Sequence, residues 1–269
     1  MHWLAAVSLL RRERRPGVLV TVADVRGHAP RDAGAKMVVA RDESWGTVGG
    51  GNLEETAVAR SRMLLDGAQP GPETLVVSLS DKARSEHGRQ CCGGEVTLLL
   101  EPLAVVPAVA VFGMGHVGLE LARILARHDL ELHVVDSRAA YVAPEALAAL
   151  DDGPASVHAH HAPVPEGVLG QVPRGTHVLV MTHDHAEDFA LCDTALRCTH
   201  LGTVGLIGSA AKWRRFEQGL LVEGHAPASV AAIRCPIGAG LPGKEPATIA
   251  LGVAAELLST FAAAERTRP

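Results

Sequence analysis

Short apolar runs alternate with longer amphipathic segments over the second half of the chain. Such runs are typical of strands buried in a parallel sheet, and the amphipathic segments between them are typical of covering helices. The expected strands are 108–112, 131–135, 155–160, 176–182 and 203–207, and the expected helices are 116–128, 184–199, 209–222 and 246–262. This alternation predicts an α/β fold with a Rossmann-like, doubly wound parallel sheet.

The first part of the chain has a different pattern. An amphipathic helix is expected over residues 3–14, before Pro16-Gly17, and strands are expected over 18–25, 36–40, 74–79 and 95–100. Asn52 and Glu55 have the spacing of a capping box, which predicts a helix from Asn52 to about Asp66. We therefore expect a small N-terminal α/β domain over residues 1–103, a linker over 102–107 and the Rossmann-like domain over 108–269.

The turn after the strand 108–112 has the spacing of a dinucleotide-binding loop. Gly113, Gly115 and Gly118 match G-x-G-x-x-G at the start of a helix, and Asp136 ends the next strand. In such a site Gly115 lets a pyrophosphate approach the backbone and Asp136 binds a ribose hydroxyl, which would favour NAD over NADP. A Rossmann topology that has lost or reassigned its nucleotide gives the same pattern, so both interpretations stay open.

Composition and charge narrow the classes of partner and compartment. The net charge of −5 and the aromatic content of 3% argue against a nucleic-acid partner. The N-terminal apolar run precedes its arginines, which is the reverse of a signal peptide, and the longest apolar stretch near the C-terminus contains Glu256. We expect a cytoplasmic protein without a membrane segment. The five cysteines fit reduced thiols better than a disulfide framework.

Two adjacent cysteines form the most distinctive motif, Gln90-Cys91-Cys92-Gly93-Gly94. Neighbouring side chains converge poorly on one zinc ion, but thiolates suit soft-metal ligation or persulfide chemistry. Nearby glycine amides would also lower the pKa of a thiol in this turn. The alternative is that one cysteine is a small buried apolar residue. We interpret Cys91 and Cys92 as functional and as candidate metal ligands.

Other candidate binding positions are less specific. Gly49, Gly50 and Gly51 precede a helix and could bind phosphate through backbone amides, or could simply form a tight turn. His183 follows an expected strand at the carboxyl edge of the sheet, and Lys244 lies in a glycine and proline loop where it could meet a phosphate. Lys212 could attract an anion or lie on a solvated helix face. His158 and His160 share one face of a strand and His161 the other, so that this trio is not a ready ligand set.

Several short motifs follow one another along the chain in a distinctive order. They are Gly34-Ala-Lys-Met37, Gly46-Thr-Val-Gly-Gly-Gly-Asn-Leu-Glu54, Gln90-Cys-Cys-Gly-Gly94, Phe112-Gly-Met-Gly-His-Val-Gly118, Met181-Thr-His183, Gly205-Leu-Ile-Gly-Ser209 with Lys212, Cys235-Pro-Ile-Gly238 and Gly243-Lys-Glu-Pro246. In these motifs the chain resembles the XdhC/CoxI family of xanthine dehydrogenase accessory proteins, which act as molybdenum-cofactor chaperones. His28, in Arg26-Gly27-His28-Ala29-Pro30-Arg31, departs from the small hydroxyl residue expected in the family.

The resemblance implies a protein that binds the molybdenum cofactor (molybdopterin), protects it while a cysteine desulfurase supplies sulfur, and delivers it to xanthine dehydrogenase. It implies a chaperone rather than a catalyst, so no catalytic residue is expected, and a homodimer stays open. The physical counterpart is a host with thiols near the metal and backbone amides near the phosphate. Two alternatives remain: an NAD-dependent oxidoreductase that uses the Rossmann turn, and a thiol redox sensor that uses Cys91 and Cys92.

Overall fold

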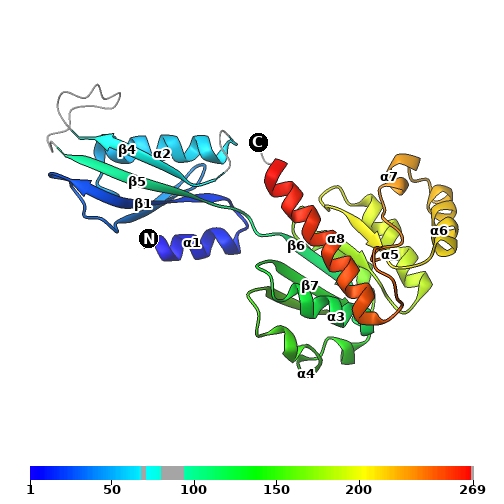
Figure 1. Cartoon of the computed structure of the whole chain (residues 1–269). Coiled ribbons are helices and arrows are strands. Elements are labelled where there is room, and N and C mark those ends of the chain that lie inside the picture. Colours follow the sequence, from blue (N-terminus) through cyan, green and yellow to red (C-terminus); the bar gives the residue numbers. More distant parts are fainter. Residues whose placement is uncertain (68–70, 80–93, 268–269) are drawn as a thin grey trace. The chain divides into compact units, whose positions relative to one another are not determined.

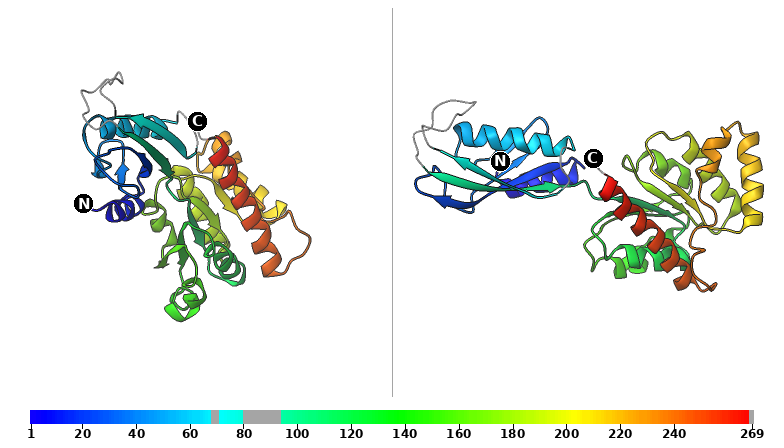
Figure 2. Two further views of the ribbon diagram at one scale, coloured as in Figure 1. Left: turned by 60° about the vertical axis from the view of Figure 1, so that its left-hand side comes forward. Right: turned by 45° about the horizontal axis from the view of Figure 1, so that its top comes forward.

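The computed structural model describes residues 1–67, 71–79 and 94–267. The chain divides into two compact units, which Figures 1 and 2 show as ribbons. Unit 1 comprises Met1–Val105 with Ala264–Pro269, and unit 2 comprises Val106–Ala263. Each unit has its own sheet and its own core, and each is described by itself below. Cys91 and Cys92 lie outside the described residues.

Unit 1 is an antiparallel sheet with a helix on each face. Its strands lie in the order β3-β2-β1-β5-β4, and Val18, Val20 and Val22 of β1 alternate into the larger core under α2. Ala6 and Leu10 of α1 pack in a second cluster with Val38 and Ala40. The elements are α1 (Trp3–Arg12), β1 (Gly17–Arg26), β2 (Lys36–Val39), β3 (Ser44–Gly46), α2 (Gly51–Leu65), β4 (Glu73–Ser78) and β5 (Glu95–Leu103).

The predicted capping box at the start of α2 is wrong. The helix begins at Gly51, and its N-cap is Gly50 with φ 72°, two residues before the expected cap Asn52. Asn52 is therefore inside the helix, and its side chain is buried. The carboxylate of Glu54, not that of Glu55, reaches back and accepts hydrogen bonds from the Gly50 amide and the Thr47 hydroxyl. Three consecutive glycines with positive φ set this helix start, because other residues adopt that backbone only with strain.

Unit 2 is a parallel five-stranded sheet in the order β10-β9-β6-β7-β8. This confirms the Rossmann-like, doubly wound sheet. Its elements are β6 (Ala108–Phe112), α3 (His116–Leu125), β7 (Glu131–Asp136), η1 (Ala139–Tyr141), α4 (Pro144–Leu147), η2 (Ala148–Leu150), β8 (Ser156–His161), η3 (Pro165–Gly170), β9 (His177–Val180), α5 (His185–Arg197), β10 (Val204–Leu206), α6 (Ala210–Val222), α7 (Pro227–Ala231) and α8 (Pro246–Thr267).

The two faces of this sheet have separate cores. Val109 and Val111 of β6 pack on the side of α3 and α8, whereas Ala110 and Phe112 pack on the side of α5 and α6. Successive residues of a strand point to opposite faces, so a strand covered by helices on both sides must be apolar at every position. The continuous run Ala108–Phe112, which is buried throughout, meets this requirement. Figure 2 shows α8, in red, on the opposite side of the sheet from α6.

Helix α8 is more apolar and more continuous than the sequence pattern suggested. Its segment Pro246–Ala263 is the one helical stretch in the described chain that is long and apolar enough to cross a membrane, with mean hydropathy 1.4. Glu256 does not interrupt it and accepts a hydrogen bond from the Gly238 amide. Ala250, Val253 and Leu257 are buried in the core of unit 2, at the spacing of one helix face. Packing against the sheet therefore accounts for this face of α8, whereas 28% of the segment is buried in all and Leu251 is exposed.

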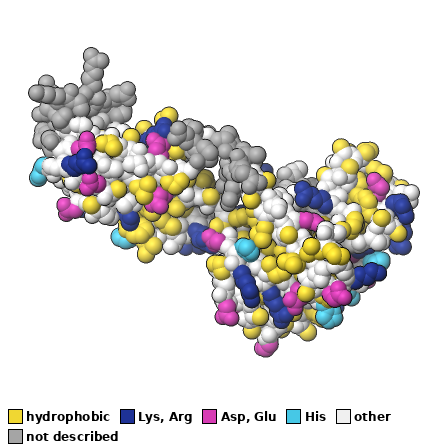
Figure 3. Space-filling view, viewed as in Figure 1, with side chains coloured by type: hydrophobic (Ala, Val, Ile, Leu, Met, Phe, Trp, Pro, Cys, Tyr) yellow, Lys and Arg dark blue, Asp and Glu magenta, His cyan; other side chains and the backbone are white. Residues whose placement is uncertain are grey.

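Charged side chains of both signs are interspersed on the surface. On the face drawn in Figure 3, lysines and arginines lie among aspartates and glutamates in each unit. Several of these form exposed ion pairs, such as Arg41 with Asp66 and Arg123 with Glu120. Exposed pairs of this kind contribute at most about 1 kcal/mol each. The stability of each unit is therefore expected to come mainly from its apolar core.

Candidate functional site

The carboxyl edge of the parallel sheet contains the predicted glycine turn. The strand order reverses between β6 and β9, so the loops after these two strands flank the topological switch point where open α/β sheets bind ligands. Gly113 has φ 101°, and a Cβ atom there would lie 2.4 Å from the Met181 carbonyl oxygen. A Cβ on Gly118 would lie 2.0 Å from the Gly113 carbonyl oxygen. Both positions therefore require glycine because neighbouring backbone atoms occupy the space.

Gly115 has a different environment from the other two glycines. It is the N-cap of α3, without a side-chain cap, and a Cβ placed on it would have no atom within 4 Å among the described residues. The helix start leaves its first amides without intrahelical acceptors. Open space beside such amides fits an anionic ligand, as the G-x-G-x-x-G pattern predicts.

Asp136 is committed to bonds within the protein. Its side chain is almost fully buried, and Oδ2 accepts a hydrogen bond of 2.7 Å from the Met114 amide. The Arg138 guanidinium donates to both carboxylate oxygens, and its Cζ lies 3.7 Å from the centre of the Tyr141 ring. Burial opposes ionisation, but the hydrogen bonds from Arg138 and Met114 hold the pKa of Asp136 below its usual value. Asp136 thus ties the glycine turn to β7, and its role as a ribose ligand stays a prediction.

A buried ion pair connects the loops after β9 and β10. The Asp188 carboxylate, on α5, has no exposed surface and accepts hydrogen bonds from the amide and hydroxyl of Thr182. Its other oxygen pairs with the Lys212 ammonium, which also donates to the Ile207 carbonyl oxygen at 3.0 Å. The solvated-face interpretation of Lys212 is therefore wrong. Lys212 positions the ends of β9 and β10 rather than pointing to solvent.

The remaining predicted positions of unit 2 lie at the surface. His183 is exposed, and Asp184 caps α5 by accepting hydrogen bonds from the amides of Ala186 and Glu187. Asp184 is thus the side-chain N-cap of α5. Lys244 is exposed in the loop before α8, and its amide donates to Glu245. The contribution of His183 and Lys244 to ligand binding stays a prediction.

In unit 1, two glycine motifs meet the same loop. A Cβ on Gly49 would lie 2.5 Å from Cγ of Pro30, and a Cβ on Gly94 would lie 2.3 Å from the carbonyl oxygen of His28. The loop 26–30 therefore contacts both the glycine-rich start of α2 and the last residue of the Gln90–Gly94 motif. Gly51, in contrast, would place a Cβ in open space, with no atom within 4 Å among the described residues. The fold thus brings three sequence motifs of unit 1 together.

Comparison with protein families covers most of both units. Residues 109–257 match the XdhC Rossmann domain, and residues 10–78 match the XdhC and CoxI family. The chain belongs to the XdhC and CoxI family. The matched ranges contain the glycine turn, the Asp188–Lys212 pair and the start of α2, whereas the Cys91-Cys92 motif falls between them.

Individual relatives of this XdhC/CoxI protein are distant. The uncharacterized protein YqeB of Escherichia coli K12 is 23% identical over 268 residues, and this alignment covers 96% of the chain and 46% of YqeB. The chain therefore spans about half the length of that curated relative. A solved structure described as a xanthine dehydrogenase from Bacillus halodurans is 18% identical with a TM-score of 0.49, over 98% of this chain and 96% of the other. The Escherichia coli tRNA N6-threonylcarbamoyladenosine dehydratase TcdA is 15% identical with a TM-score of 0.44. This match covers 60% of the present chain and 88% of TcdA.

The described cysteines of this family member are not activated. Cys192 is fully buried, and burial raises the pKa of its thiol to about 12. Burial also raises the pKa of Cys198 and of Cys235. Only the thiolate is strongly nucleophilic, so these three residues are poor candidates for sulfur chemistry at neutral pH.

We expect alkylation to reflect this difference in pKa. With iodoacetamide at pH 7.5, Cys192 should stay unmodified in the native protein over a period in which it is fully modified in guanidinium chloride. Peptide mass spectrometry measures both. Equal modification of Cys192 in the two states would contradict its burial.

A histidine cluster lies on β7 and β8, and the sequence pattern indicated only the half of it on β8. His158 and His160 do share a face, as predicted, but His133 of the neighbouring strand stacks against both rings. Burial first, and then the positive charge of His158, lower the pKa of His133 from 6.5 to about 4. The signal that could have found the cluster is the parallel register, which pairs His133 with His158.

We expect this cluster to make the protein sensitive to mild acid. In the unfolded chain His133 binds a proton below about pH 6.5, whereas in the native state, where its pKa is lowered, it binds one only near pH 4. The free energy of unfolding is therefore highest above pH 6.5 and decreases as the pH falls from 6.5 to about 4. The loss should be at most about 3 kcal/mol. Urea unfolding at pH 7 and 4.5 in EDTA measures it. His133→Gln should flatten the profile, and the exposed His161→Gln should leave it unchanged.

Proposed function

We propose that this chain binds the molybdenum cofactor, protects it during sulfuration and delivers it to xanthine dehydrogenase. Membership of the XdhC and CoxI family supports a role in xanthine dehydrogenase maturation in general. The observation that carries the finer proposal is the meeting of two glycine motifs on loop 26–30, which brings the end of the Cys91-Cys92 motif to the loop that also contacts the start of α2.

The described residues of unit 1 fit the phosphate of this cofactor. Gly50 and Gly51 have positive φ, and a side chain on either would point into open space. The amides of Gly49 and Gly50 already donate to Thr47 and Glu54, and the helix start presents the amide of Gly51 and those that follow it to an anion. We assign the phosphate to the Gly51 end of the Gly49–Gly51 turn and the molybdenum to Cys91 and Cys92, whose thiolates suit a soft metal. The bound cofactor supplies the redox centre of the target enzyme, and this chain's residues would hold it and exclude water.

The first test addresses the thiols. The full chain is purified without oxygen from cells that make the cofactor, and its pterin and molybdenum contents are measured. We expect both in the wild type, and loss of both in the Cys91→Ala/Cys92→Ala variant. Cys198→Ala, which changes a cysteine of unit 2 with a raised pKa, is the matched control and should retain the cofactor. Equal retention in all three proteins would remove the cysteines from the proposal.

The second test addresses the phosphate and serves as a quantitative prediction. Asp and Asn both tolerate the positive φ of 56° at Gly51, and Asp in a first helical turn suits the helix dipole, so both variants should fold. Gly51→Asp adds a negative charge where the phosphate is expected and should reduce cofactor affinity about tenfold or more, which corresponds to about 1.4 kcal/mol. Gly51→Asn has the same shape without the charge and should bind almost normally. Equal affinities for the two variants would place the phosphate elsewhere.

An NAD-dependent oxidoreductase is the second candidate, and the open space at Gly115 favours it. The engagement of both Asp136 oxygens with Arg138 and Met114 counts against it, because a ribose hydroxyl would compete with these donors. NADH fluorescence with the purified chain distinguishes the candidates. Binding in the micromolar range that Gly115→Val abolishes would favour the oxidoreductase.

A further inference from the structure

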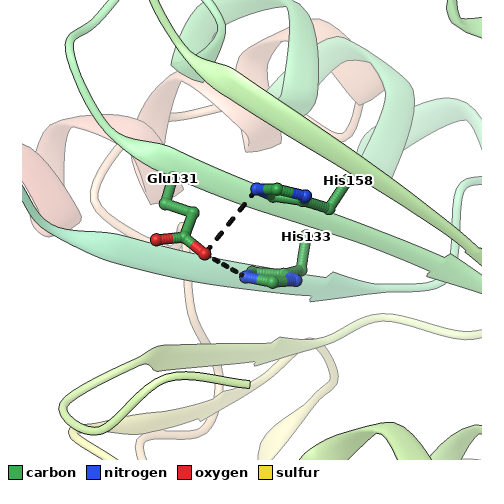
Figure 4. A group of neighbouring side chains, drawn as sticks. All are labelled: Glu131, His133 and His158. Atoms are coloured by element: carbon green, nitrogen blue, oxygen red, sulfur yellow. Dashed lines mark hydrogen bonds and ion pairs between the residues drawn. The ribbon is translucent and has the colours of Figure 1, made fainter. Parts of the chain in front are cut away.

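Two adjacent strands of unit 2 place four polar side chains on one face of the sheet. Glu131 and His133 are two residues apart on β7, and His158 and His160 are two residues apart on β8. The parallel register aligns His133 with His158 and Val135 with His160. Because strand side chains alternate between faces, all four side chains lie on the same side of the sheet. Figure 4 shows Glu131, His133 and His158 turned toward one another.

The distances among these groups match those of a metal site before the ion is bound. Oε1 of Glu131 lies 3.1 Å from Nε2 of His133 and 3.6 Å from Nε2 of His158. One possible ligand atom from each of the three residues lies within 4.8 Å of the other two. Ligands about 2.0–2.2 Å from one zinc ion in tetrahedral geometry lie roughly 3.3–3.6 Å apart. Only a small movement of His158 is needed, and its side chain is 47% exposed and can rotate.

His160 gives His133 the support that a ligating histidine requires. Nδ1 of His133 lies 3.1 Å from Nε2 of His160. A histidine that ligates a metal through one nitrogen usually has the other fixed by a hydrogen-bond partner, which sets its tautomer and orientation. With the His133–His160 bond in place, Nε2 of His133 is directed to the side where Glu131 and His158 lie. The ring of His133 is buried, so its orientation is set before any ion arrives.

We propose that Glu131, His133 and His158 bind a divalent first-row transition metal, with Zn²⁺ as the expected ion. Two imidazoles and one carboxylate suit zinc, copper, nickel or iron, whereas magnesium and calcium prefer oxygen ligands alone. The exposure of His158 leaves the remaining positions to water. The site lies at the amino end of β7, whereas the glycine turn follows the carboxyl end of β6, so this metal site is separate from the glycine turn of unit 2.

The test uses the full chain, dialysed against a chelator and titrated with ZnCl₂ by isothermal calorimetry. We expect one saturable equivalent, with a dissociation constant weakened at least tenfold by His158→Ala and by Glu131→Gln. His161→Ala is the matched control, because His161 is exposed on the same strand and faces the other side. It should bind like the wild type. Absence of a saturable equivalent, or equal affinities for His158→Ala and His161→Ala, would overturn the site.

Cobalt distinguishes this cluster from the cysteines. Co²⁺ bound to thiolates gives intense ligand-to-metal charge-transfer absorption in the near ultraviolet, whereas Co²⁺ on nitrogen and oxygen ligands gives only weak visible bands. We expect weak visible bands that persist in Cys91→Ser/Cys92→Ser and disappear in His158→Ala. A charge-transfer band that disappears in the cysteine variant instead would assign the bound metal to the thiols and overturn the proposal.

Discussion

Replacement of Lys212 by methionine should lower the free energy of unfolding by about 3–5 kcal/mol, because it leaves the Asp188 carboxylate buried without a cation. Asp188 has no exposed surface, and Lys212 is the cation that pairs with it. The Ile207 carbonyl oxygen loses its ammonium donor in the same variant. Urea unfolding followed by circular dichroism, in the wild type and in Lys212→Met, measures the difference.

Two further variants separate the charge from the loss of packing. In Asp188→Asn/Lys212→Met the neutral side chain can still accept the bonds from Thr182, so we expect this double variant to be more stable than Lys212→Met alone. Arg214→Met changes an exposed cation on the same helix and should alter stability by no more than about 0.5 kcal/mol. If Lys212→Met costs no more than Arg214→Met, the buried pair does not stabilise unit 2.

Replacement of Gly113 by alanine should cost at least about 3 kcal/mol, because two effects combine at this position. The backbone φ of 101° is strained for any residue with a side chain, and the new methyl group would lie 2.4 Å from the Met181 carbonyl oxygen. A backbone atom cannot rotate away as a side chain can, so the loops after β6 and β9 must separate. Thermal unfolding of the variant should show this loss as a lower Tm.

Gly115→Ala is the matched control for the turn. Its φ of −68° suits alanine, and the methyl group would meet no described atom within 4 Å. We expect a cost of about 1 kcal/mol or less, from the poorer N-cap. A cost similar to that of Gly113→Ala would contradict the described contact between Gly113 and Met181.

Local patterns predicted the elements of unit 2 well. The apolar run at 108–112 is a strand buried on both faces, as its composition required, and Gly113 to Gly118 form the expected turn into α3. These features depend on residues that are close in the sequence, where alternation and glycine spacing are informative. The family resemblance is also confirmed. It could be recognised from the sequence because its motifs are short and each lies within a few neighbouring residues.

Features that depend on distant residues could not be predicted in this way. Lys212 pairs with Asp188, 24 residues earlier, and only the folded chain brings α5 and α6 together. His133 and His158 become neighbours through strand register, which the sequence does not specify directly. At the start of α2, both Glu54 and Glu55 are near enough in sequence to accept a hydrogen bond from the amide before the helix. The positive φ of the preceding glycines places the helix start so that Glu54 accepts it.

The order of strands in unit 1 has a consequence for synthesis of the protein. Its central strand β1 and the neighbouring strand β5 are far apart in the sequence of the unit, and their pairing extends from Gly17 with Leu103 to Arg26 with Glu95. Contacts between residues so far apart in sequence form late, because a long loop must close first. In unit 2, β6 pairs with β7 after only one intervening helix. On the ribosome, unit 1 therefore cannot complete its sheet until residue 103 has emerged, and its half-formed core needs protection from aggregation until then.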